Sequence, residues 1–79
     1  MNELLKRIQV DPKIMVGKPV IRGTRITVEH IMNELAVGMS AAETVDQHRP
    51  RLTEEDIRAA CANASALLSG ARIFPLAAE

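Results

Sequence analysis

Residues 27–45 read TVEHIMNELAVGMSAAETV, and this stretch predicts two helices joined by a tight turn. Apolar residues recur in it with the period of a helix, on a stripe that carries Val28, Ile31, Met32, Leu35 and Ala36. Thr27 is suited to cap the first amides of this helix, and Gly38 stands where a left-handed residue commonly ends one. We therefore expect the first of the two helices to cover residues 28–37.

The second helix of this stretch starts from a capping box. Ser40 and Glu43 have the spacing at which each side chain satisfies a free amide at the start of a helix. This pattern predicts a short helix over residues 41–48, which Pro50 brings to an end.

A third helix is expected over residues 54–69. Thr53 and Asp56 repeat the capping pattern, with Asp in place of the usual Glu, and Gly70 stops the helix. Its predicted apolar face consists of Ile57, Ala60, Cys61, Ala64, Leu67 and Leu68. On that face Cys61 is expected to be a small buried hydrophobe, not a nucleophile.

Short β-strands are expected before the helices. Gly17 and Gly23 interrupt β-branched runs, and Pro19 belongs at a sheet edge or at the start of a strand. Gly23 and Thr24 indicate a tight turn or bulge. The expected strand pieces are residues 6–10, after a short turn of helix, residues 20–21 and residues 26–28.

Length and composition predict one small domain over residues 1–79. It divides into a β-rich basic arm (1–28), a three-helix core (28–70) and an apolar tail (71–79). The fold class is mainly α, with a helix-turn-helix core behind short N-terminal strands. The only aromatic residue is Phe74, so the core must be built from small and aliphatic side chains, and a homodimer is expected.

Charge is distributed unevenly along the chain, although its formal net charge is zero. Residues 1–28 hold six basic and two acidic side chains, whereas residues 29–79 hold four basic and eight acidic ones. Residues 12–28 contain four cations and no acid. This run is either a footprint for phosphates or an acidic partner, or simply a solvated strand face.

If DNA is bound, the basic arm is the better candidate for its binding surface. The third helix opens with the acidic run 54–56, which would face phosphates if that helix entered a groove, and leaves only Arg58 and Asn63 to read bases. The candidate DNA-binding residues are Lys18, Arg22 and Arg25 in the arm, with Arg49 and Arg51 in the loop before the third helix.

No catalytic residue, metal site or cofactor is expected. The single cysteine excludes an internal disulfide, and Gly17 does not belong to a phosphate-binding P-loop. His30 and His48 have no acidic residue at a convincing ligand spacing, so each is expected to be a surface or loop-packing residue. The sequence has no signal-peptide or membrane-span pattern, which predicts a cytoplasmic protein without membrane contact.

Two segments resemble the DUF433 family of small prokaryotic antitoxin-like domains: DPKIMVGKPVIRGTRITVEHIMNELAVGMSAAETV and LTEEDIRAACANASALL. The resemblance implies a homeodomain-like trihelical core with an N-terminal β-arm, often dimeric, and the antitoxin role of a VapBC-type pair beside a PIN-like ribonuclease. The matching positions are Asp11, Pro12, Gly17, Lys18, Pro19, Ile21, Arg22, Gly23, Thr24, Arg25 and Ile26 in the arm, and Leu52, Thr53, Asp56 and Ile57 later.

The chain departs from the family pattern in two places. QHRPRLT, with His48 and Arg49, replaces the usual aromatic residue and proline and has one extra residue before Leu52. NASALL replaces a stretch that usually contains tyrosine. Partner contacts that those aromatic residues make in the family are therefore less safely expected in this chain. The arm motif is unaffected by either change.

The leading hypothesis is an antitoxin that binds and silences a PIN-like toxin and, as a dimer, binds its own operator DNA through the arm. The expected toxin-facing surface is the exposed side of the third helix together with the tail residues Ile73, Phe74 and Leu76. One alternative is a stand-alone helix-turn-helix DNA-binding regulator. Another is a dimer that binds only protein, in which Arg22 or Arg25 pairs with Glu29 or Glu34.

Overall fold

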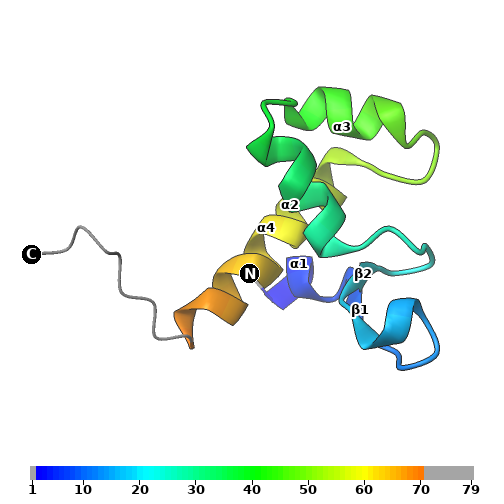
Figure 1. Ribbon diagram of the computed structural model, residues 1–79, viewed down its shortest axis with the longest axis vertical. Helices are drawn as coiled ribbons and strands as arrows, with labels where there is room; N and C mark the ends of the chain where they lie inside the picture. Colours follow the sequence, from blue (N-terminus) through cyan, green and yellow to red (C-terminus); the bar gives the residue numbers. More distant parts are fainter. Residues whose placement is uncertain (1, 71–79) are drawn as a thin grey trace, which may run out of the picture.

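The computed structural model describes residues 2–70 of the chain and confirms the mainly helical class (Figure 1). Helix α4 packs against α1, α2 and α3, so it forms the centre of the domain. In chain order the elements are α1 (Asn2–Leu5), β1 (Ile8–Gln9), the 3-10 turn η1 (Met15–Gly17), β2 (Val20–Ile21), α2 (Val28–Ala36), α3 (Ala41–Gln47) and α4 (Glu54–Ser69).

The N-terminal arm forms an antiparallel pair of very short strands. Ile8 lies opposite Ile21, and Gln9 lies opposite Val20. The strand predicted over residues 6–10 is shorter than expected, because the amide of Arg7 still bonds to Leu4 O at the end of the preceding helical turn.

The strand predicted over residues 26–28 is wrong. Only an isolated bridge between Val20 and Thr27 is present there. The reason is the cap: Thr27 Oγ1 accepts a hydrogen bond from His30 N at 2.9 Å, which commits Val28 to the first position of α2.

The turn between β2 and α2 has the predicted form. Gly23 has a φ of +82°, and Thr24 N donates to Ile21 O at 2.9 Å. The Thr24 hydroxyl also accepts from Ile26 N at 2.9 Å, which fixes the chain on its way into α2. Residues 22–27 therefore form a defined loop beside the start of α2.

Both predicted capping boxes are present. In α3 the Ser40 hydroxyl accepts from Glu43 N, and the Glu43 carboxylate accepts from Ser40 N. In α4 the pair Thr53 and Asp56 makes the same exchange. These local signals explain why the three helices begin where the sequence predicted and end within one residue of the prediction.

The hydrophobic core lies between the arm and the helices, and its buried members are Ile21, Ile26, Val28, Ile31, Leu52, Ile57 and Ala60. The predicted apolar face of α4 is wrong in part: Cys61 is exposed, and Leu67 and Leu68 are more than half exposed. Helix α1 and strand β1 also pack on α4. The buried surface of α4 therefore includes Ala59 and Ala62, which the predicted apolar face left out. Within residues 2–70 no helix has the length and apolar character needed to cross a membrane.

Candidate functional site

Three of the five basic residues predicted to bind DNA have partners within the fold. Lys18 Nζ lies 2.8 Å from Glu29 Oε1, and Arg49 Nε lies 2.7 Å from Asp46 Oδ1. Arg22 donates from Nε to Lys6 O at 2.9 Å and from Nη2 to Ile8 O at 3.2 Å. Arg22 therefore ties β2 to the chain around β1.

Arg25 and Arg51 are different. Both side chains are exposed, and neither takes part in any ion pair found among residues 2–70. The pairing of Arg22 or Arg25 with Glu29 or Glu34, expected if the protein is a dimer that binds only protein, is therefore wrong. Glu29 is held by Lys18, and Glu34 is held by two histidines.

The two arginines come together although they are far apart in the sequence. Arg25 lies in the loop before α2 and Arg51 in the loop after α3, and both loops lie on one side of the molecule (Figure 1). A bond of 2.8 Å from Arg51 N to His48 O closes the second loop. Both arginines line two neighbouring grooves, and we call this surface the Arg25–Arg51 face.

The grooves differ in their other walls. The first, of about 290 Å³, is also lined by Met15, Ile26, Thr27, His30 and His48. The second, of about 440 Å³, is also lined by Gln9, Ile14, Gly23 and Thr24. Two guanidinium groups without an ion-pair partner in residues 2–70 give this face the donors and the charge that a phosphate requires.

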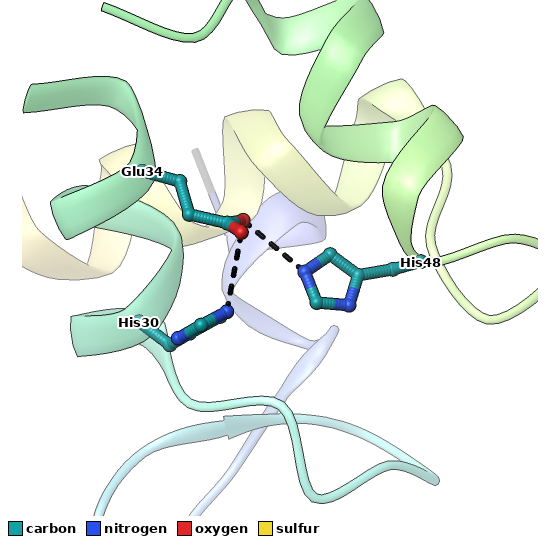
Figure 2. A group of neighbouring side chains, drawn as sticks. All are labelled: His30, Glu34 and His48. Carbon is teal, nitrogen blue, oxygen red and sulfur yellow. Dashed lines mark hydrogen bonds and ion pairs between the residues drawn. The ribbon is translucent and has the colours of Figure 1, made fainter. Parts of the chain in front are cut away.

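A cluster of three side chains lies beside the first groove, and two of them, His30 and His48, line it. Figure 2 shows His30, Glu34 and His48 with their side chains directed at one another. Glu34 Oε2 lies 3.3 Å from His30 Nε2, and Glu34 Oε1 lies 3.1 Å from His48 Nε2. The two imidazole rings meet edge to face, with ring centroids 5.3 Å apart.

Local structure positions each member of this cluster. His30 and Glu34 lie one turn apart on α2, so they share a helix face. His48 is the C-cap residue directly after α3, and its side chain points toward Glu34 on α2 (Figure 2). The side chains of Glu34 and His48 are 13% and 14% exposed, whereas that of His30 is 52% exposed.

The expectation that neither histidine has a carboxylate at ligand spacing is wrong. Glu34 follows His30 by four residues, a spacing visible in the sequence. His48 joins them only through the packing of α3 against α2, which the sequence pattern does not reveal.

An ion pair between the arm and α4 was also not predicted from the sequence. Arg7 Nη1 lies 3.1 Å from Asp56 Oδ1, and the Asp56 side chain is only 9% exposed. Asp56 Oδ2 accepts from Thr53 N at the same time, so one carboxylate caps α4 and anchors the arm. This role is structural.

An apolar surface lies on the other end of α4. Its groove of about 270 Å³ is lined by Pro19, Val28, Glu29, Met32, Ala64, Leu67 and Leu68, and we call it the α4 apolar groove. The predicted partner-binding residues Ile73, Phe74 and Leu76 lie outside the described residues.

Comparison with known proteins identifies one family. The family model described as "Protein of unknown function (DUF433)" matches residues 8–64, more than half of the chain. An uncharacterized protein of Archaeoglobus fulgidus is 64% identical over 25 residues, which cover 32% of this chain and 69% of that protein. No solved structure matches the chain.

Proposed function

This chain belongs to the DUF433 family, and we propose that it is a non-catalytic regulator of the antitoxin type that binds its own operator DNA and a PIN-like toxin. The DNA contact is assigned to the Arg25–Arg51 face. The observation that carries this assignment is the convergence of two arginines, neither in an ion pair within residues 2–70, on the same two grooves.

The chemistry of this face suits a phosphate backbone. Guanidinium groups bind phosphate with two parallel hydrogen bonds, and such contacts position a protein on DNA without reading the bases. Lys18 and Arg49 lie in exposed ion pairs, which are weak enough in water to be exchanged for phosphate contacts. They are therefore secondary contacts in this proposal.

The helices offer less to DNA than the loops do. Helix α3, with the sequence AAETVDQ, carries no lysine or arginine, and α4 opens with Glu54 and Glu55. The Arg58 side chain, one of only two on α4 that could read bases, lies 3.2 Å from Glu55 Oε1. These features disfavour the alternative of a stand-alone regulator that inserts a recognition helix into the major groove.

The toxin contact is assigned to the α4 apolar groove and to the tail residues 71–79. Leu67 and Leu68 are 61% and 57% exposed at the edge of that groove, and an apolar surface of this kind supports binding to another protein. The tail follows directly after Gly70, and Ile73 comes five positions after Leu68 in the sequence. Neutralisation by such a contact requires no catalysis, and the active unit is proposed to be a homodimer.

The DNA assignment is tested by the salt dependence of binding. Fluorescence anisotropy measures affinity for a duplex from the chain's own upstream region, between about 50 and 200 mM salt. Each phosphate contact contributes about 0.9 to the slope of log affinity against log salt. The double variant Arg25→Ala/Arg51→Ala removes both contacts from each protomer, so its slope is expected to fall by about 2 per protomer, or about 4 for a bound dimer.

The matched control is Lys6→Ala/Arg58→Ala. It removes the same charge from two exposed side chains that line neither groove of the Arg25–Arg51 face, and its slope is expected to stay near that of the wild type. Equal slopes for both double variants would mean that only net charge matters, and the assignment to the Arg25–Arg51 face would fail.

The toxin assignment is tested by purification of the tagged chain from its native host, followed by mass spectrometry. A PIN-like protein in stoichiometric amount is expected, and both Leu67→Asp/Leu68→Asp and deletion of residues 71–79 should release it without changing DNA affinity. Recovery of DNA without a protein partner would favour the stand-alone regulator instead. Sedimentation velocity tests the proposed dimer.

A further inference from the structure

The proposed DNA contact uses the two arginines and leaves the cluster of His30, Glu34 and His48 without a role. We propose that these three side chains bind a divalent transition-metal ion, with Zn²⁺ as the fitting ion. Their ligand atoms all lie within 4.8 Å of one another, and they come from two helices that the fold holds together. This inference does not rest on the proposed function.

The donor set is the first argument. Two imidazole nitrogens and one carboxylate oxygen form a set that Zn²⁺ takes in open sites, where solvent or a ligand occupies the fourth position. Imidazole donors also exclude Mg²⁺ and Ca²⁺, which prefer oxygen alone. The choice of a zinc-like ion therefore follows from the residue types.

The distances are the second argument. Around a tetrahedral zinc ion with bonds near 2.1 Å, neighbouring ligand atoms lie about 3.4 Å apart. Each Nε2 lies close to that distance from one oxygen of the Glu34 carboxylate, His30 at 3.3 Å from Oε2 and His48 at 3.1 Å from Oε1. One ligand atom from each of the three residues lies within 4.8 Å of the other two, so small side-chain movements close the site, and the half-exposed His30 side chain has room to move.

The burial pattern is the third argument. Glu34 and His48 are mostly covered, so packing holds two ligands in place before an ion arrives. An ion held there would lie at the wall of the groove that also contains Arg25 and Arg51. Those cations oppose a bare divalent ion, and the electrostatics favour an anionic fourth ligand such as hydroxide or chloride.

A simpler role for the cluster is a hydrogen-bonded network without metal. In that case each ring must donate an N–H from Nε2 to the carboxylate, because an ionised carboxylate only accepts. With a metal, the same two Nε2 atoms offer lone pairs instead. Removal of one histidine therefore has different consequences under the two accounts.

The test is zinc titration by calorimetry, with Co²⁺ absorption as a second probe of a tetrahedral site. Tag-free protein carrying Cys61→Ser is used, because the exposed thiol is a competing ligand. We expect one Zn²⁺ per chain, a zinc-dependent rise in melting temperature and the intense visible absorption of tetrahedral Co²⁺.

Ligand variants identify the residues. Loss of a group that merely orients a metal ligand already costs about tenfold or more in affinity, so His30→Gln, Glu34→Gln and His48→Gln should each weaken zinc binding by more than that. Glu29→Gln is the matched control: it removes an exposed carboxylate from the same helix and should bind zinc as the wild type does. His30→Gln is informative even if the other two variants fold poorly, because its side chain is half exposed.

The outcomes separate this inference from the DNA proposal. The variant Arg25→Ala/Arg51→Ala is expected to keep its zinc site while its DNA salt slope falls. No stoichiometric zinc in the Cys61→Ser protein, or zinc affinity unchanged in His30→Gln, would overturn the metal site and leave the hydrogen-bonded network as its explanation.

Discussion

Arginines lie both beside the β1–β2 strand pair, which we call the hairpin side, and on the Arg25–Arg51 face. Those on the hairpin side have partners within the fold, whereas Arg25 and Arg51 have no ion-pair partner among residues 2–70. On the hairpin side, Arg7 pairs with the carboxylate of Asp56, and Arg22 donates to two backbone carbonyls. On the other face, Arg25 and Arg51 line two grooves and join no ion pair found in residues 2–70.

This contrast shows that the number of cations in the arm overstates its affinity for phosphate. Arg22 and Arg25 lie three residues apart, and their side chains have similar chemistry. They differ in their partners. Arg22 bonds to two backbone carbonyls and holds the arm together, whereas Arg25 joins no ion pair among residues 2–70 and is available to a ligand. Variants on the two sides should therefore affect different properties, stability on one and binding on the other.

The largest expected effect is on stability, at Asp56. Asp56→Ala removes one half of the α4 capping box, the hydrogen bond from Thr53 N, together with the partner of Arg7, and we expect a loss of about 2 kcal/mol in the free energy of unfolding. Urea denaturation followed by circular dichroism measures it. Asp56→Asn keeps a capping oxygen but loses the charge, so it should lose less; an equal loss would mean that the cap is unimportant.

Arg22→Ala should also act on stability. It removes the donor to Lys6 O and Ile8 O, and we expect a loss of about 1 kcal/mol. The same denaturation experiment measures this loss. If Arg22→Ala instead left stability intact and reduced the DNA salt slope, Arg22 would belong to the DNA-binding surface as the sequence first suggested.

Arg25→Ala should show the reverse pattern. An exposed side chain outside any ion pair of residues 2–70 contributes little to folding, so we expect its stability to stay within about 0.5 kcal/mol of the wild type. Its DNA salt slope should fall by about 0.9 per protomer, or about 2 for a bound dimer, because each protomer loses one phosphate contact. If Arg25→Ala were destabilised as much as Arg22→Ala, the two regions would not differ in their contribution to stability, and the proposed contrast would be wrong.

The smallest effect is expected at the ion pair of Lys18 and Glu29. The hydrogen bond and charge of Lys18 lower the pKa of Glu29, so the pair stabilises the fold at neutral pH and loses this contribution as the pH falls through the lowered pKa. The Glu29 side chain is exposed, so the effect is small and screened by salt. Melting temperatures of Glu29→Gln and wild type should differ slightly at neutral pH and low salt and converge in acid; a gap that widens in acid would contradict the assignment.

Local signals in the sequence predicted most of the fold. Each of the three main helices starts at a capping residue, Thr27, Ser40 or Thr53, because hydrogen bonds over three residues decide a helix start. Burial on α4 was harder to predict. Cys61 follows the apolar period but is exposed, since the packing of α1 and β1 on α4 depends on contacts distant in the sequence.

The candidate site was predictable only in part. The sequence identified Arg25, in the basic arm, and Arg51, in a loop, as candidate DNA-binding residues, but their convergence depends on how the two segments fold. The pair of His30 and Glu34 has a spacing that predicts proximity on a helix, whereas His48 and the bond between Arg7 and Asp56 join residues from separate elements. Periodicity and capping carry no information about such contacts.

The most direct test of the central claim is an NMR titration of ¹⁵N-labelled protein with its upstream DNA duplex. If DNA binds at the Arg25–Arg51 face, amide shifts are expected to concentrate in the two loops around Arg25 and Arg51 and to spare the start of α4 at Glu54 and Glu55. Shifts centred on α3 or on the start of α4, with the two loops unaffected, would contradict this assignment.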